Sequence, residues 1–196
     1  MAAVVYNIVL TGVGGQGILT AAKVLGKAAM MAGYYAAVGE IHGLAQRGGS
    51  VIGFVRISEN PVASTVPEGT ADLLLSFEPL EAIRYINYAK KGTTFIVNEA
   101  KMVPVSANLG STVYPPLEEI RKNLEEFGPC HMFDATALAK SLGSTIYVNS
   151  IMLGKSASVL SFLLPKEVIE RALEEVLPRD LENNLKAFDL GYQVSQ

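Results

Sequence analysis

Three glycines near the start of the chain have the spacing of a phosphate-binding turn. Gly12, Gly14 and Gly17 satisfy the pattern Gly-x-Gly-x-x-Gly, and Gly15 and Gln16 lie inside it. Where side chains are missing, a ligand's phosphates can approach the backbone, and the N–H groups that start the next helix attract an anion. The spacing therefore predicts that these five residues bind an anionic cofactor. Close packing of a strand on a helix demands the same turn, so a purely structural role stays open.

A second glycine-containing loop runs from Glu40 to Ser50 and carries an arginine. Arg47 offers a fork of donors that matches a phosphate or a carboxylate, and Gly48 and Gly49 let the backbone come close beside it. We expect all three residues to contribute to cofactor binding. Pairing of Arg47 with a local carboxylate is the alternative. For His42, in the same loop, we expect a structural role rather than proton transfer.

A dinucleotide site would need one more residue, an acid about 20 residues beyond the glycine turn that holds the ribose hydroxyls. Glu40 lies at that distance. The loop that follows it is not a feature that an ordinary nicotinamide-binding domain requires. The sequence thus leaves a nicotinamide or flavin site possible without favouring it.

Residues able to carry out catalysis by themselves are scarce, and we assign none. The two histidines, His42 and His131, are far apart, and neither Gly-x-Ser-x-Gly nor His-Glu-x-x-His occurs. The single cysteine, Cys130, is expected to be a buried inert thiol. One cysteine excludes an intrachain disulfide and a four-cysteine zinc or iron–sulfur site made by this chain alone, so we expect no metal site here.

Alternating apolar and helical segments must position these residues, and they predict an α/β fold. Expected strands span Val4–Leu10, Tyr34–Val38, Val51–Ile57, Ala71–Phe77, Thr93–Asn98 and His131–Phe133, and expected helices span Ile18–Ala32, Glu78–Ala89 (ended by Lys90, Lys91 and Gly92) and Leu117–Phe127, with another starting near Ala135. Residues 100–115 are expected to form a long connection. Both glycine loops are then expected at the carboxyl edge of the sheet, where ligands bind in such folds.

The C-terminal third is expected to be helical, with helices at Val148–Leu164, Lys166–Leu177 and Leu181–Leu190. Asn149 and Ser150 lie on the first of these helices. They could face the glycine edge, or they could form a buried polar contact between helices.

Composition places the chain among ordered globular proteins. It has 196 residues, 49% of them hydrophobic and 18% charged, and a net charge of −3, which does not suit general nucleic-acid binding. We expect a Rossmann-like, doubly wound, mostly parallel sheet with a helical C-terminal third, folded as a single domain over residues 1–196. No apolar run suits a membrane span or a signal peptide, so we expect a cytoplasmic location without membrane contact.

Three sequence blocks together resemble a known family. They are the Gly12–Gly17 turn, the Glu40–Ser50 loop and the stretch from Ala71 to Ala82, which contains Ser-Phe-Glu-Pro-Leu-Glu-Ala. They resemble the gamma-type domain of 2-oxoacid:ferredoxin oxidoreductases over nearly the whole chain. Within this family, the His-Gly-x-Ala-Gln-Arg-Gly-Gly form of the second loop most resembles the indolepyruvate type. Leu44 stands where relatives often carry methionine, a volume-conserving difference.

The resemblance implies oxidative decarboxylation of an aryl 2-oxoacid with coenzyme A, giving aryl acetyl-CoA, carbon dioxide and reduced ferredoxin. It also implies that a larger alpha subunit carries thiamine diphosphate and the iron–sulfur clusters, that this chain alone holds no cofactor and is inactive alone, and that ferredoxin is reached through the complex. Two alternatives remain. One is a stand-alone dinucleotide-dependent oxidoreductase, and the other is an assembly or gamma subunit for a different 2-oxoacid.

Overall fold

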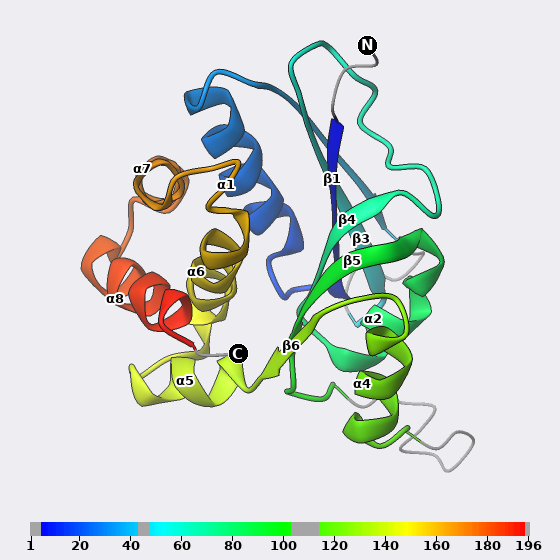
Figure 1. Ribbon diagram of the computed structural model, residues 1–196. Helices are drawn as coiled ribbons and strands as arrows, with labels where there is room; N and C mark the ends of the chain where they lie inside the picture. The colour runs from blue at the N-terminus through cyan, green and yellow to red at the C-terminus, as the bar shows by residue number, and fades with distance from the viewer. Residues whose placement is uncertain (1–4, 43–47, 103–113, 195–196) are drawn as a thin grey trace.

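The computed structural model describes residues 5–42, 48–102 and 114–194 and contains one six-stranded sheet in the order β2-β3-β1-β4-β5-β6. Its fold is α/β and doubly wound, with a mostly parallel sheet and a helical C-terminal third, as the sequence predicted (Figure 1). The strands are β1 Val5–Val13, β2 Tyr35–His42, β3 Ser50–Ser58, β4 Ala71–Ser76, β5 Ala89–Asn98 and β6 Cys130–Phe133.

One strand runs against the others and changes the expected neighbourhood of the glycine turn. The pairs β1–β4, β4–β5 and β5–β6 are parallel, whereas β3 is antiparallel to both β1 and β2. In a dinucleotide-binding fold, the strand beside β1 is the parallel strand that ends in the ribose-binding acid. Here Glu40 lies on β2 opposite Gly53, and β3 separates it from β1.

Helices cover both faces of the sheet (Figure 1). One face carries most of them, including the C-terminal group, and the other carries α2 and α4. The helices are α1 Ile18–Met31, α2 Pro79–Arg84, α4 Leu117–Glu125, α5 Ala135–Ser141, α6 Val148–Leu160, α7 Lys166–Val176 and α8 Leu181–Tyr192, with short 3-10 helices at Ile86–Tyr88 and Thr145–Tyr147.

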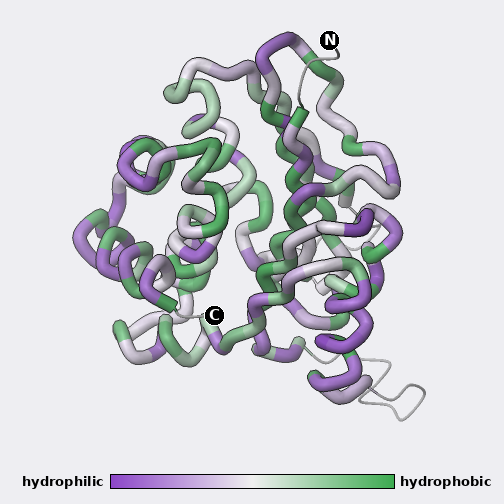
Figure 2. The backbone as a smooth tube through the Cα atoms, in the orientation of Figure 1, coloured by the Kyte–Doolittle hydropathy of each residue, from purple (hydrophilic) through white to green (hydrophobic). Residues whose placement is uncertain are grey.

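Successive residues of the central strands belong to two different hydrophobic cores, because strand side chains alternate between the two faces of a sheet. Leu73 and Leu75 of β4 belong to the larger core under α1 and α6, and Leu74 belongs to the smaller one near α4. These strand residues are all fully buried. Figure 2 accordingly shows the central strands as largely hydrophobic and α4 as largely hydrophilic.

Local capping predictions agree with the structure. The Asp134 carboxylate accepts a hydrogen bond from Ala137 N at 2.7 Å at the start of α5. Gly33 and Gly143 follow α1 and α5 with φ of 88° and 96°, the left-handed backbone that glycine adopts without strain. Within the described ranges, no helix is both long and apolar enough to cross a bilayer.

The helix expected over Glu78–Ala89 is shorter than predicted. It ends at Arg84, and after the 3-10 turn at Ile86–Tyr88 the strand β5 already begins at Ala89. Lys90, Lys91 and Gly92 therefore lie in β5 and do not end a helix. Tertiary contacts override the local pattern, because the Tyr88 ring packs 5.5 Å from that of Phe54 and Gly92 N donates to Phe127 O at 2.7 Å.

Candidate functional site

The two glycine loops meet at the carboxyl edge of the sheet. Gly14 N, after β1, donates a hydrogen bond of 2.8 Å to Gly49 O, just before β3. Because β3 is antiparallel, its start lies at the same edge as the end of β1. The described part of the second loop thus lies where the sequence predicted, and Gly48 adopts a positive φ of 75° there.

Gln16 closes the first glycine turn with both ends of its carboxamide. Its Oε1 accepts from Val13 N at 2.7 Å, and its Nε2 donates to Phe77 O at 3.0 Å. Gln16 N also donates to Val13 O at 3.0 Å, with Gly15 at φ 102° in the position that needs a positive φ. The backbone N–H of Val13 is therefore taken by the chain's own carboxamide and is not free to bind a phosphate.

Two glycines of the turn lie where neighbouring side chains pack closely. A Cβ on Gly12 would lie 2.6 Å from both Gln16 Oε1 and Ile18 Cδ1. A Cβ on Gly17, which caps α1 with φ 77°, would lie 2.3 Å from Asn149 Nδ2. The packing interpretation therefore explains Gly12 and Gly17 without a ligand, whereas Gly15 has open space around it.

A pocket of about 380 Å³ opens beside this turn, between the ends of β1 and β5 and the starts of α5 and α6. Among the described residues, its polar lining is mostly carboxamides and hydroxyls, with one cation, Lys101. The lining residues are Gly15, Gln16, Asn98, Ala100, Lys101, Met102, Thr136, Thr145, Ile146, Val148 and Asn149. Such groups can bind and orient a ligand, and the described lining has no acid–base pair or activated nucleophile.

Asn98, at the end of β5, forms hydrogen bonds with two neighbouring segments of the chain. The residue is 1% exposed, and its Nδ2 donates to Thr136 Oγ1 at 3.0 Å and to Phe77 O at 3.3 Å. Phe77 O also accepts from Gln16, so the glycine turn and the end of β5 share one acceptor. The polar wall is consequently fixed before any ligand arrives, an arrangement that favours binding.

Asn149 reaches the same turn from α6. Its Nδ2 donates to Gln16 O at 3.0 Å, while its Oδ1 is buried without a hydrogen-bond partner in the described chain. Ser150, the next residue, instead donates to Asn184 Oδ1 at 2.6 Å and links α6 to α8. Both alternatives from the sequence thus apply, one to each residue. The unsatisfied Asn149 oxygen is an acceptor that a ligand N–H or O–H could use.

Two buried glutamates at the start of α2, Glu78 and Glu81, hold the backbone near the pocket in place. Glu78 accepts from Glu81 N at 3.0 Å, from Met102 N at 3.1 Å and from the Tyr114 hydroxyl. Glu81 accepts from the Ser50 hydroxyl at the start of β3, and burial raises the pKa of the Glu81 carboxyl. Neither glutamate lines the pocket. Their contacts fix Met102 and Ser50, so their role is to position backbone.

The predicted cofactor-binding residues differ in whether they line the pocket or shape the turns beside it. Gly15 and Gln16 line the pocket, and Gly12, Gly14, Gly17, Gly48 and Gly49 shape the turns around it. Arg47 lies outside the described residues. His131 and Cys130, on β6, do not line this pocket, and burial raises the pKa of the Cys130 thiol to about 12, in keeping with an inert thiol.

Sequence reasoning missed Asn98, Lys101 and Thr136, which line the pocket. Asn98 ends β5, Lys101 follows it closely, and Thr136 lies in the first turn of the helix after β6. A signal was available, since polar residues just past the carboxyl ends of parallel strands gather at one edge. Which polar residues converge there depended on the order of the strands.

Comparison with known proteins gives consistent results. Residues 7–194 match the family model described as pyruvate ferredoxin/flavodoxin oxidoreductase. The chain is 47% identical to indolepyruvate oxidoreductase subunit IorB of Thermococcus kodakarensis and of Pyrococcus horikoshii, in both cases over 97% of this chain and 96% of the relative. The gamma subunit of a keto/oxoacid ferredoxin oxidoreductase from Geobacter sulfurreducens superposes with a TM-score of 0.70 at 26% identity, covering 96% of each chain. The chain therefore belongs to the pyruvate ferredoxin/flavodoxin oxidoreductase family.

Proposed function

We propose that this chain is the small, beta-type subunit of an indolepyruvate:ferredoxin oxidoreductase. The assembled enzyme would oxidatively decarboxylate an aryl 2-oxoacid with coenzyme A, giving aryl acetyl-CoA, carbon dioxide and reduced ferredoxin. The observation that carries the proposal is the 47% identity, over almost the full length of both chains, to subunits named for indolepyruvate. Residues 1–196 would act as a single domain that is inactive alone.

The redox and thiamine cofactors belong, in this proposal, to a larger alpha subunit that also meets ferredoxin. The residues of this chain do not fit those groups. A four-thiolate cluster needs four cysteines and the sequence has one, and the sequence contains no Gly-Asp-Gly thiamine signature. We therefore assign no step of the decarboxylation to residues of this chain.

For the carboxyl-edge pocket we propose a binding role toward coenzyme A, an anion rich in amide and hydroxyl groups. Lys101 of the pocket lining, together with Arg47 of the Glu40–Ser50 sequence block, would attract phosphate groups. The buried Asn149 oxygen and the carboxamide wall would accept and donate hydrogen bonds. In this proposal Gly12, Gly14, Gly15, Gln16, Gly17, Gly48 and Gly49 keep the backbone close to the ligand.

Anaerobic purification of the tagged chain from its native cells tests the subunit assignment. We expect a stoichiometric larger partner, broad visible absorption from iron–sulfur clusters, and reduction of ferredoxin that depends on coenzyme A. Indolepyruvate, pyruvate and 2-ketoisovalerate are supplied in parallel. Faster turnover of indolepyruvate supports the indolepyruvate type, and preference for either other acid contradicts it. A lone, colourless chain would contradict the subunit assignment itself.

Charge removal at the pocket tests the coenzyme A contact in the purified complex. Replacing Arg47 by alanine is expected to raise the KM for coenzyme A about tenfold or more, and Lys101→Ala several-fold, since a charge-assisted hydrogen bond contributes about 1.5–3 kcal/mol and an exposed cation less. Turnover at saturating coenzyme A should change little. Lys23→Ala, which removes an exposed charge from α1 away from the pocket, is the matched control. Equal KM values for all three variants would contradict the contact.

A further inference from the structure

Lys155 is a buried cation that has no counter-charge among the residues the structure describes. It lies within α6, is 3% exposed, and its Nζ donates to Val194 O at 3.0 Å. None of the ion pairs among the described residues includes it. A buried ammonium that has a carbonyl but no anion beside it has lost hydration without full compensation. An anion at this place would supply the missing interaction.

The Lys155 side chain lines a cavity of about 520 Å³ where β5 and β6 meet α6 and α8. The described lining residues of this cavity are all different from those of the carboxyl-edge pocket. Besides Lys155 it presents one imidazole and three hydroxyl groups, and none of its described lining residues is acidic. The lining residues are Thr94, Pro129, His131, Lys155, Ser158, Val159, Tyr192 and Val194.

Both basic groups of this cavity have lowered pKa values, and Lys155 contributes to the shift of His131. Burial lowers the pKa of His131, and the positive charge of Lys155 lowers it further. Burial also lowers the pKa of Lys155. Both shifts have the direction expected where positive charge is poorly solvated and lacks an anion. A bound anion would stabilise the charged form of each group.

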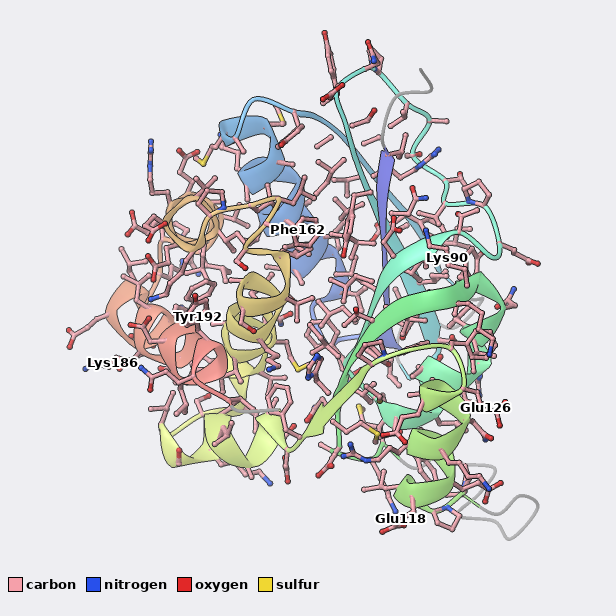
Figure 3. The ribbon with its side chains drawn as sticks, viewed as in Figure 1. Lys90, Glu118, Glu126, Phe162, Lys186 and Tyr192 are labelled. Carbon is pink, nitrogen blue, oxygen red and sulfur yellow. The ribbon has the colours of Figure 1, made fainter. Side chains whose placement is uncertain are left out.

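The hydroxyl groups of Thr94 and Tyr192 complete the set of donors, because the Ser158 hydroxyl proton is already used within α6. Ser158 lies one turn beyond Lys155 on α6, and its hydroxyl donates to Lys155 O at 2.8 Å. Tyr192, labelled in Figure 3, lies near the end of α8 and lines the cavity from that side, with Lys166 Nζ 5.0 Å from its ring centre. The cavity thus combines a buried cation, an imidazole and neutral donors, a combination that suits an oxyanion.

We propose that this cavity is a binding site for a small oxyanion, a carboxylate or a phosphate group, held mainly by Lys155 with His131 as a second donor. The site goes beyond the function proposed above and does not depend on it. In the contrasting interpretation, Lys155 only anchors the chain after α8 through Val194. Such an anchor would not respond to added anions.

The chain has only two histidines, which makes the test direct. The full-length chain carrying histidine labelled with ¹³C at Cε1 gives two ring signals, and His131→Asn assigns them. Sodium phosphate and sodium acetate are titrated separately at pH 6.5, each against sodium chloride at matched ionic strength. We expect the His131 signal to move saturably toward the imidazolium position with phosphate or acetate, with a millimolar or lower dissociation constant. Chloride should not produce the shift.

Variants at Lys155 decide between the two interpretations. Lys155→Met keeps an unbranched side chain and is expected to weaken anion binding about tenfold or more, whereas Lys155→Arg should retain it. Lys140→Met removes an exposed charge outside the cavity and should bind as the parent does. Circular dichroism checks that each variant is folded. If Lys155→Met does not fold, the Lys155→Arg titration and the chloride comparison still decide between the two interpretations.

The tighter of the two probes, phosphate or acetate, identifies the class of oxyanion. A shift that chloride reproduces, or that survives in Lys155→Met, would overturn the proposal.

Discussion

Gly17 shows how a single missing Cβ shapes the carboxyl-edge pocket. Its left-handed backbone starts α1, and the space beside it is filled by the Asn149 carboxamide that donates to Gln16 O. The Gly-x-Gly-x-x-Gly pattern that suggests phosphate binding is therefore also what lets α6 approach the turn. At this residue, the motif joins a packing role to a possible binding role.

Alanine at Gly17 tests this contact. We expect Gly17→Ala to cost about 2 kcal/mol of unfolding free energy, because the left-handed conformation strains an alanine and the new Cβ displaces Asn149. Gly15→Ala is the matched control, since Gly15 also has a positive φ but nothing within 4 Å of its Cβ position. Its cost should be about 1 kcal/mol, from strain alone. Urea unfolding measures both, and equal losses would contradict a role for the Asn149 contact.

Cys130 gives a second prediction at the residue scale. Burial raises the pKa of its thiol to about 12, whereas an unfolded thiol ionises near 8.5. At pH 8 the folded protein should react with an aromatic disulfide reagent about 10³-fold more slowly than the chain unfolded in guanidinium. The raised pKa also means that the contribution of Cys130 to stability is complete below pH 8.5 and declines as the pH rises toward 12. Cys130→Ala should lack that decline, and rapid modification of the native protein would contradict the prediction.

Helices α6 and α8 cross at two glycines. A Cβ on Gly154 would lie 1.9 Å from Phe188 O, and one on Gly191 would lie 1.9 Å from Ile151 O. The obstacles are backbone atoms, so no side chain can move aside. The close approach also brings Ser150 within hydrogen-bond distance of Asn184. The helical C-terminal third therefore depends on small residues at one crossing.

Gly154→Ala is expected to destabilise the protein although alanine favours helix. The clash with backbone should cost about 3 kcal/mol or more, and the gain in helix propensity of about 1 kcal/mol offsets only part of it. We expect the melting temperature to fall by about 5–10 °C in differential scanning calorimetry. Lys186→Ala, on the solvent-exposed side of α8 (Figure 3), serves as the control and should change it by no more than about 2 °C. An unchanged melting temperature for Gly154→Ala would show that the helices can separate freely.

At the scale of the whole molecule, the strand order bears on the class of ligand. Because β3 lies between β1 and β2, Glu40 does not occupy the position next to the glycine turn that holds a ribose in dinucleotide folds. Gln16 moreover uses its carboxamide to satisfy the Val13 donor of the turn. These features argue against a free-standing nicotinamide or flavin enzyme.

We therefore expect no binding of NADH or FAD by the purified chain. Direct fluorescence of NADH can be followed cleanly, since the chain contains no tryptophan. Titration at micromolar protein should give no saturable enhancement, and FAD should remain free after gel filtration. The Glu40→Ala variant should give the same result as the parent chain. Saturable binding that Glu40→Ala abolishes would restore the dinucleotide interpretation.

Much of the fold followed from the sequence because the signals are local. β-branched runs predicted the strands and apolar spacing predicted the helices. Asp134 begins a helix, and Gly33 and Gly143 end helices, as expected. The short form of α2 was not predictable in the same way, since Tyr88 packs on Phe54 from a distant strand. Local propensity is weak enough for such a contact to override it.

By itself, the sequence determined the order of the elements, the conformation-demanding glycines and the blocks that identify the family. Only the tertiary structure decided that β3 would run antiparallel between β1 and β2, and that Lys155 and His131 would line one cavity. It also decided that Asn149 would bond to Gln16 O and that Asn98 would share the Phe77 O acceptor with Gln16. The physical reason is the separation along the chain over which each kind of interaction acts. Caps, turns and periodicity act over a few residues, whereas strand pairing and side-chain convergence are fixed by contacts between segments up to 133 residues apart, which leave no local trace in the chain.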